Sequence, residues 1–360
     1  MINVLHTEAS LGLGGQERRS LREMTLLDRT AFHPRYLCQP GARSGDVAES
    51  SGIETHRLRM RSIVDPVALF RLIRDLRRWR IDVIHTHSAR DAWLAGAAGR
   101  LTGIPVVRTR HLRTRIGGPF VYHRLASRVL AVSQDVADYL IGEGVPASQV
   151  QSIPTGIDLQ RFDPARTDLG DIRAELGIPP EATLIGMIAV LRRRKGHRFL
   201  IEAFSRLAEV YPEARLLIVG DGPQFANIKA QVSELGLQDK ILLTGTRNDV
   251  PDILAALDIF ALPSEEEALG TALLEAMAMQ VAVAATDVGG IPEAVGDAGL
   301  LFAASDTDPV ERSLRSLLDD AALRQGFADK GRQRVLTHFD QNLMVRRIEN
   351  VYRELRGAKP

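Results

Sequence analysis

Short runs of aliphatic and β-branched residues alternate with amphipathic stretches along the whole chain. Residues 66–79 are amphipathic, because Leu69, Ile73 and Leu76 recur at the spacing of one helical face. Ten runs are predicted as strands: residues 2–6, 36–39, 82–86, 106–109 and 129–133 in the first half, and 184–190, 215–220, 241–244, 259–263 and 281–285 in the second. Strands that alternate with helices predict parallel sheets with helices on both faces.

Two such series in 360 residues predict an α/β protein of two doubly wound domains. Residues 154–171 contain prolines and glycines and show no periodicity, as expected for a connector. We therefore expect a first domain over residues 1–163 and a second over residues 164–340. The last segment, residues 341–360, begins with a helical pattern.

The composition excludes several classes of protein. Cys38 is the only cysteine, so no disulfide can form within the chain. The first residues lack a basic segment followed by a long apolar run, and no stretch reaches the length of a membrane span. We therefore expect a cytoplasmic protein.

Positive charge is concentrated in the first half, although the formal net charge of the whole chain is +1. Residues 1–163 contain 23 arginines, no lysine and 16 acidic residues. The densest part, from Arg57 to Arg128, has 16 arginines and four acids. This cluster favours an anionic partner, either phosphate groups or a membrane surface, and we expect no nucleic acid. Arginines that are merely solvated would give the same count.

The clearest chemical signal is the segment P-S-E-E-E-A-L-G-T-A-L-L-E-A-M over residues 263–277. A strand ends at Pro263, an acidic loop follows, and a helix is predicted to begin after Gly270. Backbone N–H groups at a helix start are unpaired and lie at the positive end of the helix dipole, so they favour phosphate. Glu267 and Glu275 flank this start, and carboxylates accept hydrogen bonds from sugar hydroxyls. An ordinary surface helix also favours acids in its first turn.

Glu267 and Glu275 in this frame resemble the E-x7-E signature of retaining glycosyltransferases of family 4. Five further segments resemble the family's motifs in the same order: residues 14–17 its G-G-x-E, residues 154–158 its P-N-G-x-D with Thr replacing Asn, residues 195–196 its K-G, residues 220–223 its G-D-G-P, and residues 289–293 its G-G-x-P-E. The resemblance covers nearly the whole chain. It implies the GT-B fold, in which two Rossmann-like domains face a cleft and residues 341–360 return to the first domain.

The resemblance also implies an enzyme that transfers a sugar from a nucleotide-sugar donor, UDP- or GDP-linked, without a metal or another cofactor. The second domain would bind the donor: Arg192 and Lys195 would balance its diphosphate, Glu275 would accept from the ribose hydroxyls, and Glu267 from the transferred sugar. Val190 stands where the family usually has the phosphate-binding arginine. The other expected donor contacts are the Gly14 and Gly15 turn, Gly220, the backbone of Thr246 and Arg247 near the base, and the amides of Leu269, Gly270 and Thr271.

Residues 108–115 read R-T-R-H-L-R-T-R and follow a predicted buried strand. Loops at the carboxyl ends of parallel strands bind ligands in α/β proteins. In family 4 a histidine often follows this strand, so the resemblance implies that His111 is catalytic beside the donor sugar, together with Glu267.

The arginines around His111 suggest the acceptor. The donor phosphates are assigned to the second domain, so Arg110, Arg113 and Arg115 are expected to bind an anionic acceptor, a cell-envelope glycan or a glycolipid of the lipopolysaccharide type. Arg71, Arg74 and Arg78 would join them from one helical face. A peripheral contact with the cytoplasmic membrane leaflet is expected from the same charges.

Two other patterns could indicate metals. His85 and His87 share one strand face, and with Asp82 they suggest a site, but zinc requires a further ligand and an ordered outer shell. Asp306-Thr-Asp308 is better interpreted as a helix start capped by Asp308, because Pro309 follows. We expect no catalytic metal.

Two alternative functions stay open. A sugar-nucleotide 2-epimerase shares the fold but lacks the E-x7-E pattern in this frame. A scaffold without catalysis could keep the fold and bind a nucleotide-sugar or a glycan, although the presence of Glu267, Glu275, Lys195 and His111 argues against it.

Overall fold

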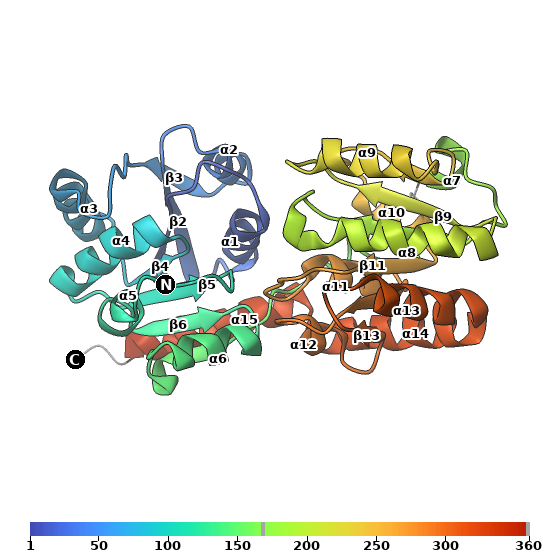
Figure 1. Cartoon of the computed structure of the whole chain (residues 1–360). Helices are drawn as coiled ribbons and strands as arrows, with labels where there is room; N and C mark the ends of the chain where they lie inside the picture. Colours follow the sequence, from blue (N-terminus) through green and yellow to red (C-terminus); the bar gives the residue numbers. More distant parts are fainter. Residues whose placement is uncertain (167–169, 358–360) are drawn as a thin grey trace. The chain divides into compact units, whose positions relative to one another are not determined.

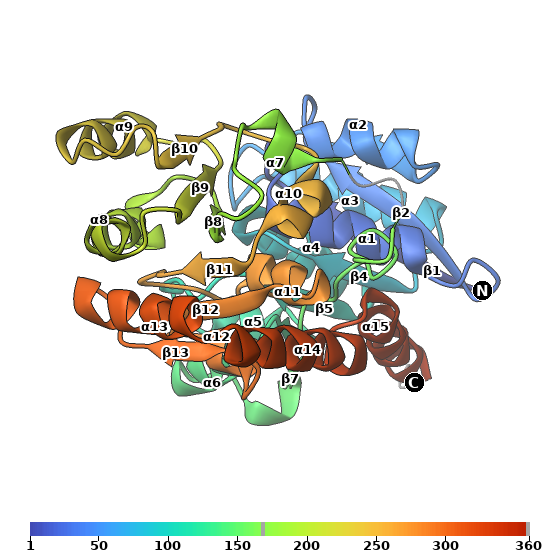
Figure 2. The ribbon, with the colours of Figure 1, turned by 90° about the vertical axis from the view of Figure 1, so that its right-hand side faces the viewer.

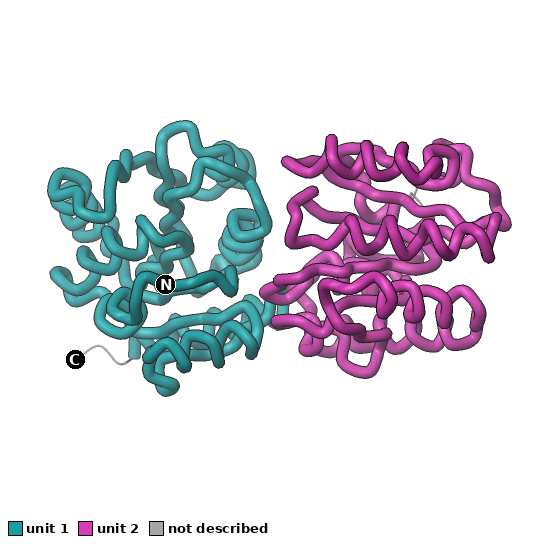
Figure 3. Tube along the Cα trace, viewed as in Figure 1, with its two compact units in different colours: residues 1–155, 342–360 teal, residues 156–341 magenta. Residues whose placement is uncertain are grey.

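The computed structural model describes residues 1–166 and 170–357 (Figure 1). The chain forms two compact units, of which unit 1 comprises Met1–Thr155 with Asn342–Pro360 and unit 2 comprises Gly156–Gln341 (Figure 3). Each unit contains one parallel sheet with helices, which confirms the predicted α/β class. No helix among the described residues is long and apolar enough to cross a membrane.

Unit 1 is built on a seven-stranded sheet with the order β3-β2-β1-β4-β5-β6-β7. Its strands are β1 (Ile2–Glu8), β2 (Phe32–Cys38), β3 (Glu54–Arg57), β4 (Val83–Thr86), β5 (Val106–Arg110), β6 (Arg128–Ala131) and β7 (Val150–Ser152). The central strands are buried on both faces, and this explains their nearly continuous aliphatic runs.

Helices cover both faces of this sheet, and each face presents a different set of strand residues to them. The helices are α1 (Gly15–Leu26), α2 (Arg43–Ser50), α3 (Pro66–Arg78), α4 (Ala89–Thr102), α5 (Phe120–Arg124), α6 (Gln134–Gly142) and α15 (Gln341–Gly357), with a short 3₁₀ turn at Ala147–Gln149. Leu5 and Leu37 pack under α3 and α4, whereas Tyr36 and Cys38 pack under α1 and α2. This alternation is the two-residue period of a strand.

Helix α15 belongs to unit 1 although it comes at the end of the chain. Its residues Val345, Ile348 and Tyr352 pack on the face formed by Val4, Val107 and neighbouring strand residues. The expected return of the C-terminal helix to the first domain is therefore confirmed.

Unit 2 has a six-stranded sheet with the order β10-β9-β8-β11-β12-β13. Its strands are β8 (Leu184–Ile188), β9 (Arg215–Val219), β10 (Ile241–Leu243), β11 (Ile259–Leu262), β12 (Ala282–Thr286) and β13 (Leu300–Phe302). Its helices are α7 (Ile172–Glu175), α8 (His197–Val210), α9 (Phe225–Glu234), α10 (Val250–Ala256), α11 (Thr271–Ala278), α12 (Ile291–Val295), α13 (Thr307–Asp319) and α14 (Ala321–His338), with a 3₁₀ turn at Arg193–Lys195. Figure 2 shows α8, α9 and α13 on one side of this sheet and α10 and α11 on the other.

The boundary between the units lies earlier than residue 163, where the sequence placed it. Ile157 pairs with Asp340 in an isolated parallel bridge, and Phe162 is buried in the core of unit 2. Gly156 fits here because a Cβ atom would come within 2.4 Å of the Cα atom of Gln341. Two segments that are distant in the sequence thus run side by side at the start of unit 2.

Candidate active site

The carboxyl ends of β1, β4 and β5 bring four histidines together in unit 1. His6 lies in β1 directly beside His85 of β4, and His87 and His111 follow the ends of β4 and β5. Each of the four is buried, at 9% exposure or less. His111, which the sequence singled out, is therefore part of a cluster and not an isolated loop residue.

The cluster forms one continuous chain of hydrogen bonds. The chain runs from the Thr109 hydroxyl to His85 (2.6 Å), to the Tyr352 hydroxyl of α15 (2.6 Å), to His6 (3.2 Å), to His87 (3.0 Å) and finally to Nε2 of His111 (3.2 Å). A residue of the last helix thus links two strands of the sheet. Nδ1 of His111 has no hydrogen-bond partner within the described parts of the chain.

These histidines are neutral in the folded protein. Burial lowers the pKa of His6 to about 3, and burial also lowers the pKa of His85, His87 and His111 well below 6.5. A neutral imidazole has one N–H group and one bare nitrogen, so the direction of the hydrogen bond on one side of each ring fixes the direction on its other side, whereas the Tyr352 hydroxyl can accept from both His85 and His6. That direction decides whether Nε2 of His111 donates to His87 or accepts from it.

A buried ion pair lies against this cluster. Nε of Arg19 donates to Oε1 of Glu23 at 2.8 Å. Oε2 of Glu23 lies 3.9 Å from Nδ1 of His85 and has no hydrogen bond within residues 1–166 and 170–357. The other guanidinium nitrogens of Arg19 donate to Thr155 Oγ1 and to the Ile153 carbonyl. Thr155, which replaces the family's Asn, therefore receives a hydrogen bond from α1.

The predicted metal ligands are only partly brought together. The Asp82 carboxylate, which the sequence offered as a possible third ligand, accepts from the backbone N–H of Asn3 at 2.9 Å and is not grouped with His85 and His87. His6 and Glu23 lie beside the two histidines instead, and one ligand atom from each of the four falls within 4.8 Å of the others. The histidine nitrogens already hydrogen-bond one another, Tyr352 and Thr109, so these side chains satisfy them without an ion.

Two buried carboxyl groups stand near the glycine loop after β1. Glu8 accepts from Gln16 at 2.6 Å and from the Ser10 backbone at 2.9 Å, and burial together with the nearby Asp91 carboxylate raises its pKa to about 7. Burial also raises the pKa of Asp91, which accepts from Thr7 at 2.9 Å. The sequence analysis missed both acids, although Glu8 ends a strand next to the Gly14 turn and could have been suspected for that reason.

Gly14 and Gly15 form the start of α1. The Gly14 amide donates to Glu17 at 2.7 Å, and a Cβ atom on Gly15 would have no neighbour within 4 Å. Protein packing therefore does not require a glycine at residue 15, and the space above it is open.

The arginines of residues 108–115 differ in environment. Arg108 is buried, donates to the Ser88 carbonyl and lies 5.5 Å above the Tyr122 ring. Arg110 donates to Thr114, and Arg113 pairs with Asp135 at 2.8 Å. Arg115 has no side-chain partner within the described residues. None of these arginines lines the cavity that contains Arg74 and Arg78.

In unit 2, the predicted donor residues lie around the loop between β11 and α11. Lys195, at the end of a 3₁₀ turn after β8, forms an ion pair with Glu267, and both side chains are largely buried. Arg192 begins the same turn and is exposed, and no side-chain interaction of its guanidinium occurs among the described residues. An unpaired cation therefore stands next to a paired one.

The start of α11 lacks a side-chain cap. Gly270 is its N-cap in the left-handed region, with φ +85°, where a Cβ atom would be strained. The amides of Leu269, Gly270 and Thr271 donate no hydrogen bond among the described residues. Free amides at the positive end of a helix are suited to an anion. Glu275 is half-buried one turn into this helix.

Two glycines hold the surrounding loops close together. A Cβ atom on Gly290 would lie 2.2 Å from the Ala268 carbonyl oxygen, and one on Gly220 would lie 1.9 Å from the carbonyl oxygen of Ala189. The Gly290 amide also donates to the Glu267 carbonyl at 3.2 Å. Gly220 thus has a packing reason in addition to its expected contact with the donor.

Thr246 and Arg247 follow β10, and the Arg247 side chain is engaged. It pairs with Glu175 at 2.5 Å and with Asp249. These two carboxylates occupy the guanidinium, and this is consistent with the expectation that the backbone, and not the side chain, reads the base.

Two polar residues of unit 2 escaped the sequence analysis. Ser264 and His197 are buried, and their side-chain polar atoms have no hydrogen-bond partner among the residues that the structure describes. Ser264 lies in the P-S-x-x-E frame itself, so the motif could have pointed to it. The expected helix cap, by contrast, is wrong: Asp306 and not Asp308 caps α13, because its carboxylate accepts from the Asp308 amide at 3.2 Å.

The comparisons with known proteins agree with this geometry. A family model described as Glycosyl transferases group 1 matches residues 169–334, and one described as Glycosyltransferase Family 4 matches residues 13–161. The solved structure of a glycosyltransferase from Rickettsia africae superposes with a TM-score of 0.90 at 24% identity over 98% of both chains.

Two curated relatives are similar over most of the chain. A 2-deoxystreptamine glucosyltransferase of Streptomyces kanamyceticus is 31% identical over 281 residues, which cover 71% of this chain and 73% of the relative. A UDP-Gal:alpha-D-GlcNAc-diphosphoundecaprenol alpha-1,3-galactosyltransferase of Escherichia coli is 28% identical over 375 residues, which cover 98% and 96%. The chain therefore belongs to the group 1 glycosyl transferases of family 4, and it is a glycosyltransferase with the GT-B fold.

Proposed function

We propose that this glycosyltransferase moves a sugar from a UDP- or GDP-linked donor to a cell-envelope glycan or glycolipid and retains the configuration at the anomeric carbon. The observation that carries the proposal is the start of α11, where uncapped amides lie beside two carboxylates in the E-x7-E frame. Phosphates accept hydrogen bonds from free amides, and sugar hydroxyls donate them to carboxylates, so a nucleotide-sugar needs both kinds of group. The E. coli relative, whose name gives UDP-Gal as donor, supports a nucleotide-sugar.

The donor diphosphate would lie against unit 2. The free amides of Leu269, Gly270 and Thr271 would donate to its distal phosphate, and the unpaired guanidinium of Arg192 would add a planar pair of donors. Lys195 would contribute its charge as Glu267 turns from it to the hydroxyls of the transferred sugar. Glu275 would bind the ribose hydroxyls, and the backbone of residues 246–247 would contact the base.

His111 would act on the transferred sugar as a neutral hydrogen-bonding group. Its lowered pKa, caused by burial and then by nearby arginines, rules out a standing positive charge near neutral pH. Retention needs no protein nucleophile if a phosphate oxygen of the leaving diphosphate assists the acceptor hydroxyl on the same face. Catalysis then depends on stabilising an oxocarbenium-like state and the departing diphosphate. The open space above Gly15 would let the backbone approach the sugar or phosphate.

The acceptor would be anionic and bound by unit 1. Arg115 is free to bind it, and Arg110 and Arg113 would exchange their present partners, Thr114 and Asp135, for the ligand. The E. coli relative acts on a diphosphoundecaprenol-linked sugar according to its name, and this supports a phosphorylated, lipid-linked acceptor. Such an acceptor would bring the protein to the cytoplasmic face of a membrane.

The first test is a thermal-shift screen against UDP-, GDP- and ADP-sugars, because a ligand that binds only the folded state raises the melting temperature with its concentration. The stabilising donor is then followed by NMR as it is slowly hydrolysed. We expect one nucleotide series to stabilise the protein and the released sugar to appear first with the donor's own anomeric configuration. Stabilisation without any turnover would favour a binding scaffold, and release of a 2-epimer would show an epimerase.

A further inference from the structure

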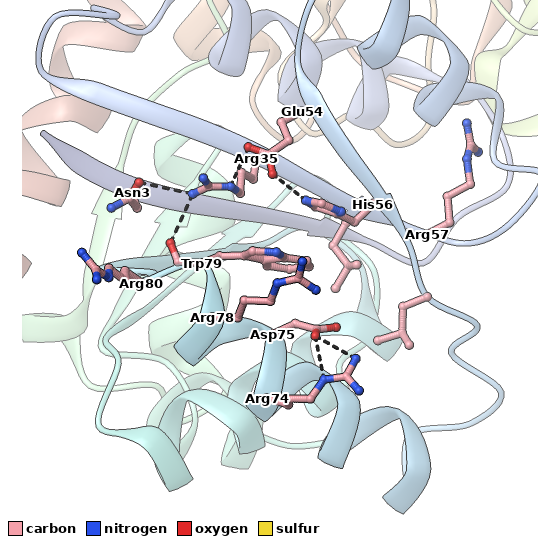
Figure 4. A pocket seen from close by; sticks show the side chains of 12 residues that line it. Asn3, Arg35, Glu54, His56, Arg57, Arg74, Asp75, Arg78, Trp79 and Arg80 are labelled. Carbon is pink, nitrogen blue, oxygen red and sulfur yellow. Dashed lines mark hydrogen bonds and ion pairs between the residues drawn. The ribbon is translucent and has the colours of Figure 1, made fainter.

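A cavity of about 750 Å³ lies in unit 1 beside the edge strand β3 and the last turns of α3 (Figure 4). Asn3, Arg35 and His56 line it from the sheet, and Arg78, Trp79 and Arg80 line it from the end of α3. Arg74 and Arg78, which the sequence grouped with the acceptor-binding arginines, belong to this lining, whereas Arg110, Arg113, Arg115 and the residues assigned to the donor and to catalysis do not. The cavity is therefore separate from the donor-binding and catalytic residues.

The lining is strongly basic. Five of its residues are arginines, whereas Glu54 and Asp75 are its only acids. Arg35 is engaged by Glu54 at 2.8 Å, and hydrogen bonds from Arg35 and two histidines lower the pKa of Glu54 to about 2 in spite of its partial burial. Arg74 is paired with Asp75 at 3.0 Å. These ion pairs engage both acids of the cavity, so the lining keeps a net positive charge.

That charge is on Arg78 and Arg80. Arg57, the remaining arginine, pairs with Asp46 and Glu49 outside the cavity. The guanidinium groups of Arg78 and Arg80 have no hydrogen bond or ion pair with any residue that the structure describes. Two unpaired arginines that flank Trp79 in the sequence are typical of a site for an anion.

The backbone of Arg80 gives an independent reason to look for a ligand. Arg80 follows the end of α3, and its φ is +51°. The Arg80 amide donates a hydrogen bond to the Arg77 carbonyl, and the Ile81 amide donates one to the Leu76 carbonyl. Helices that end in this way usually have glycine at this place, because a Cβ atom is strained in the left-handed region. Arginine is unfavourable for the backbone conformation of this turn. Its presence is therefore explained by its side chain and not by the turn. Strain of this kind is concentrated at functional sites.

The surroundings of the arginines are partly apolar. The Trp79 ring stacks on His56 with a centroid distance of 4.0 Å and an angle of 17°, and this pair forms a flat wall. Val67 and Phe70 precede Arg74 and Arg78 on one stripe of α3 and are 61% and 71% exposed. A ligand that binds its charge at the arginines can thus place an apolar part along this helix.

We propose that this cavity binds the phosphate group of an amphiphilic ligand, held by Arg78 and Arg80, with its apolar part against Trp79 and the exposed side of α3. The inference goes beyond the proposed sugar transfer and does not depend on it. The phosphate can come from a lipid headgroup or from a soluble phosphorylated compound, since the same arginines recognise both.

The test compares wild type with Arg78→Gln and Arg80→Gly, and it uses Arg77→Gln as the matched control. Arg77 lies on the same helix and is exposed but does not line the cavity. Binding is measured for inorganic phosphate, for dihexanoyl phosphatidic acid below its micelle concentration, and for phosphatidylcholine vesicles with and without phosphatidylglycerol. The melting temperature of each variant is recorded in parallel.

We expect Arg78→Gln and Arg80→Gly to weaken binding of the phosphatidic acid about tenfold each, and Arg77→Gln to leave it unchanged. Arg80→Gly should not lower the melting temperature, because relief of the positive-φ strain offsets the greater backbone freedom of glycine. This separates loss of binding from loss of folding.

The arms of the experiment identify the source of the phosphate. Binding to vesicles that requires phosphatidylglycerol and is lost in Arg78→Gln shows a lipid headgroup, whereas saturable binding of inorganic phosphate that is lost in the same variant shows a soluble source. The proposal is wrong if none of the probes binds. It is also wrong if Arg77→Gln weakens binding as much as Arg78→Gln, or if Arg80→Gly binds like wild type.

Discussion

Unit 1 completely buries histidines and carboxyl groups at the carboxyl ends of its strands, whereas unit 2 has a less deeply buried ion pair and an exposed, unpaired arginine at its corresponding edge. His85 and Asp91 are completely buried, and Lys195 and Arg192 are not. Burial keeps the unit 1 histidines neutral, because a charged group loses its hydration there. In unit 2, Lys195 pairs with Glu267 in the loop that leads to the uncapped start of α11.

This difference separates two kinds of chemistry. Unit 2 can attract and hold a diphosphate through charge, whereas unit 1 can offer only directed hydrogen bonds at His111. Substitutions in unit 2 should therefore change binding of the nucleotide, and substitutions in the histidine cluster should change the rate of transfer.

The largest effect is expected for His111→Ala. If its hydrogen bond forms mainly in the transition state, the transfer rate falls by at least ~100-fold while donor affinity changes little. Steady-state kinetics with the donor found in the thermal-shift screen measures both. A rate equal to that of wild type would return His111 to the status of an ordinary loop histidine.

Glu267→Gln should separate binding of the nucleotide from transfer of the sugar. Removing the carboxylate charge frees Lys195 from its ion pair, so the free nucleoside diphosphate should bind at least as well as before. Transfer should nevertheless fall roughly 10- to 100-fold, because a sugar hydroxyl loses its charged acceptor. Calorimetry and initial rates on the same preparation test this. Weaker nucleotide binding together with normal transfer would reverse the assignment.

Tyr352→Phe should have a smaller effect on transfer, about tenfold or less. The change removes the hydroxyl between His85 and His6 and leaves two buried imidazole nitrogens without a partner. The hydrogen-bond chain that ends at His111 is then interrupted, so kcat should fall while KM for the donor stays the same.

Tyr36→Phe is the matched control for this change. Tyr36 is also fully buried in unit 1, next to His6 in the strand register, but its hydroxyl donates to Ser44 at 3.0 Å and takes no part in the histidine chain of hydrogen bonds. It should destabilise the fold to a similar degree without lowering kcat. Equal kinetic losses in the two variants would mean that Tyr352 acts through packing alone.

The smallest effect concerns pH and Glu8. Burial raises its pKa to about 7, so the folded state holds a proton that the unfolded state, with a pKa of 4.5, releases between these values. The stability due to this proton is present below pH 4.5 and is lost as the pH rises through 7. Glu8→Gln should therefore raise the melting temperature relative to wild type at pH 8, on the order of 5 °C, and by much less at pH 5.

Fluorescence can follow this change in unit 1, because both tryptophans, Trp79 and Trp93, belong to it. Glu175→Gln in unit 2 is the control. Its ion pair with Arg247 lowers the pKa of Glu175, so its contribution changes only below about pH 4.5. A Glu8→Gln effect of the same size at pH 5 and pH 8 would show that Glu8 is not protonated in the folded state.

The sequence predicted the parts of the molecule that depend on local pattern. Aliphatic runs located the central strands, but the edge strands β3, β7 and β13 were missed, since each has only three or four residues, and E-T-H-R and V-Q-S are also polar. The glycine and glutamate motifs of unit 2 each lie within one short segment of the chain, so their residues could be named from the sequence alone. Motifs of this kind carry their own geometry.

The histidine cluster could not be predicted in the same way. Its partners are far apart in the sequence: Tyr352 meets His85 across 267 residues, and the α1 residues Arg19 and Glu23 belong to no recognisable motif. A sheet register and a returning helix bring them together. The sequence pointed to His111 through the family resemblance and to the pair His85 and His87 through their shared strand face, but it did not indicate that His6 and Glu23, and not Asp82, lie beside that pair.

The central claim is that unit 2 binds the nucleotide by charge and free amides while the unit 1 histidines act on the transfer step. Calorimetric titration of the stabilising nucleoside diphosphate into wild type, Glu275→Ala and His111→Ala tests it most directly. We expect Glu275→Ala to weaken binding roughly 10- to 100-fold and His111→Ala to bind like wild type. Wild-type affinity in Glu275→Ala, or an equal loss in His111→Ala, would contradict the account.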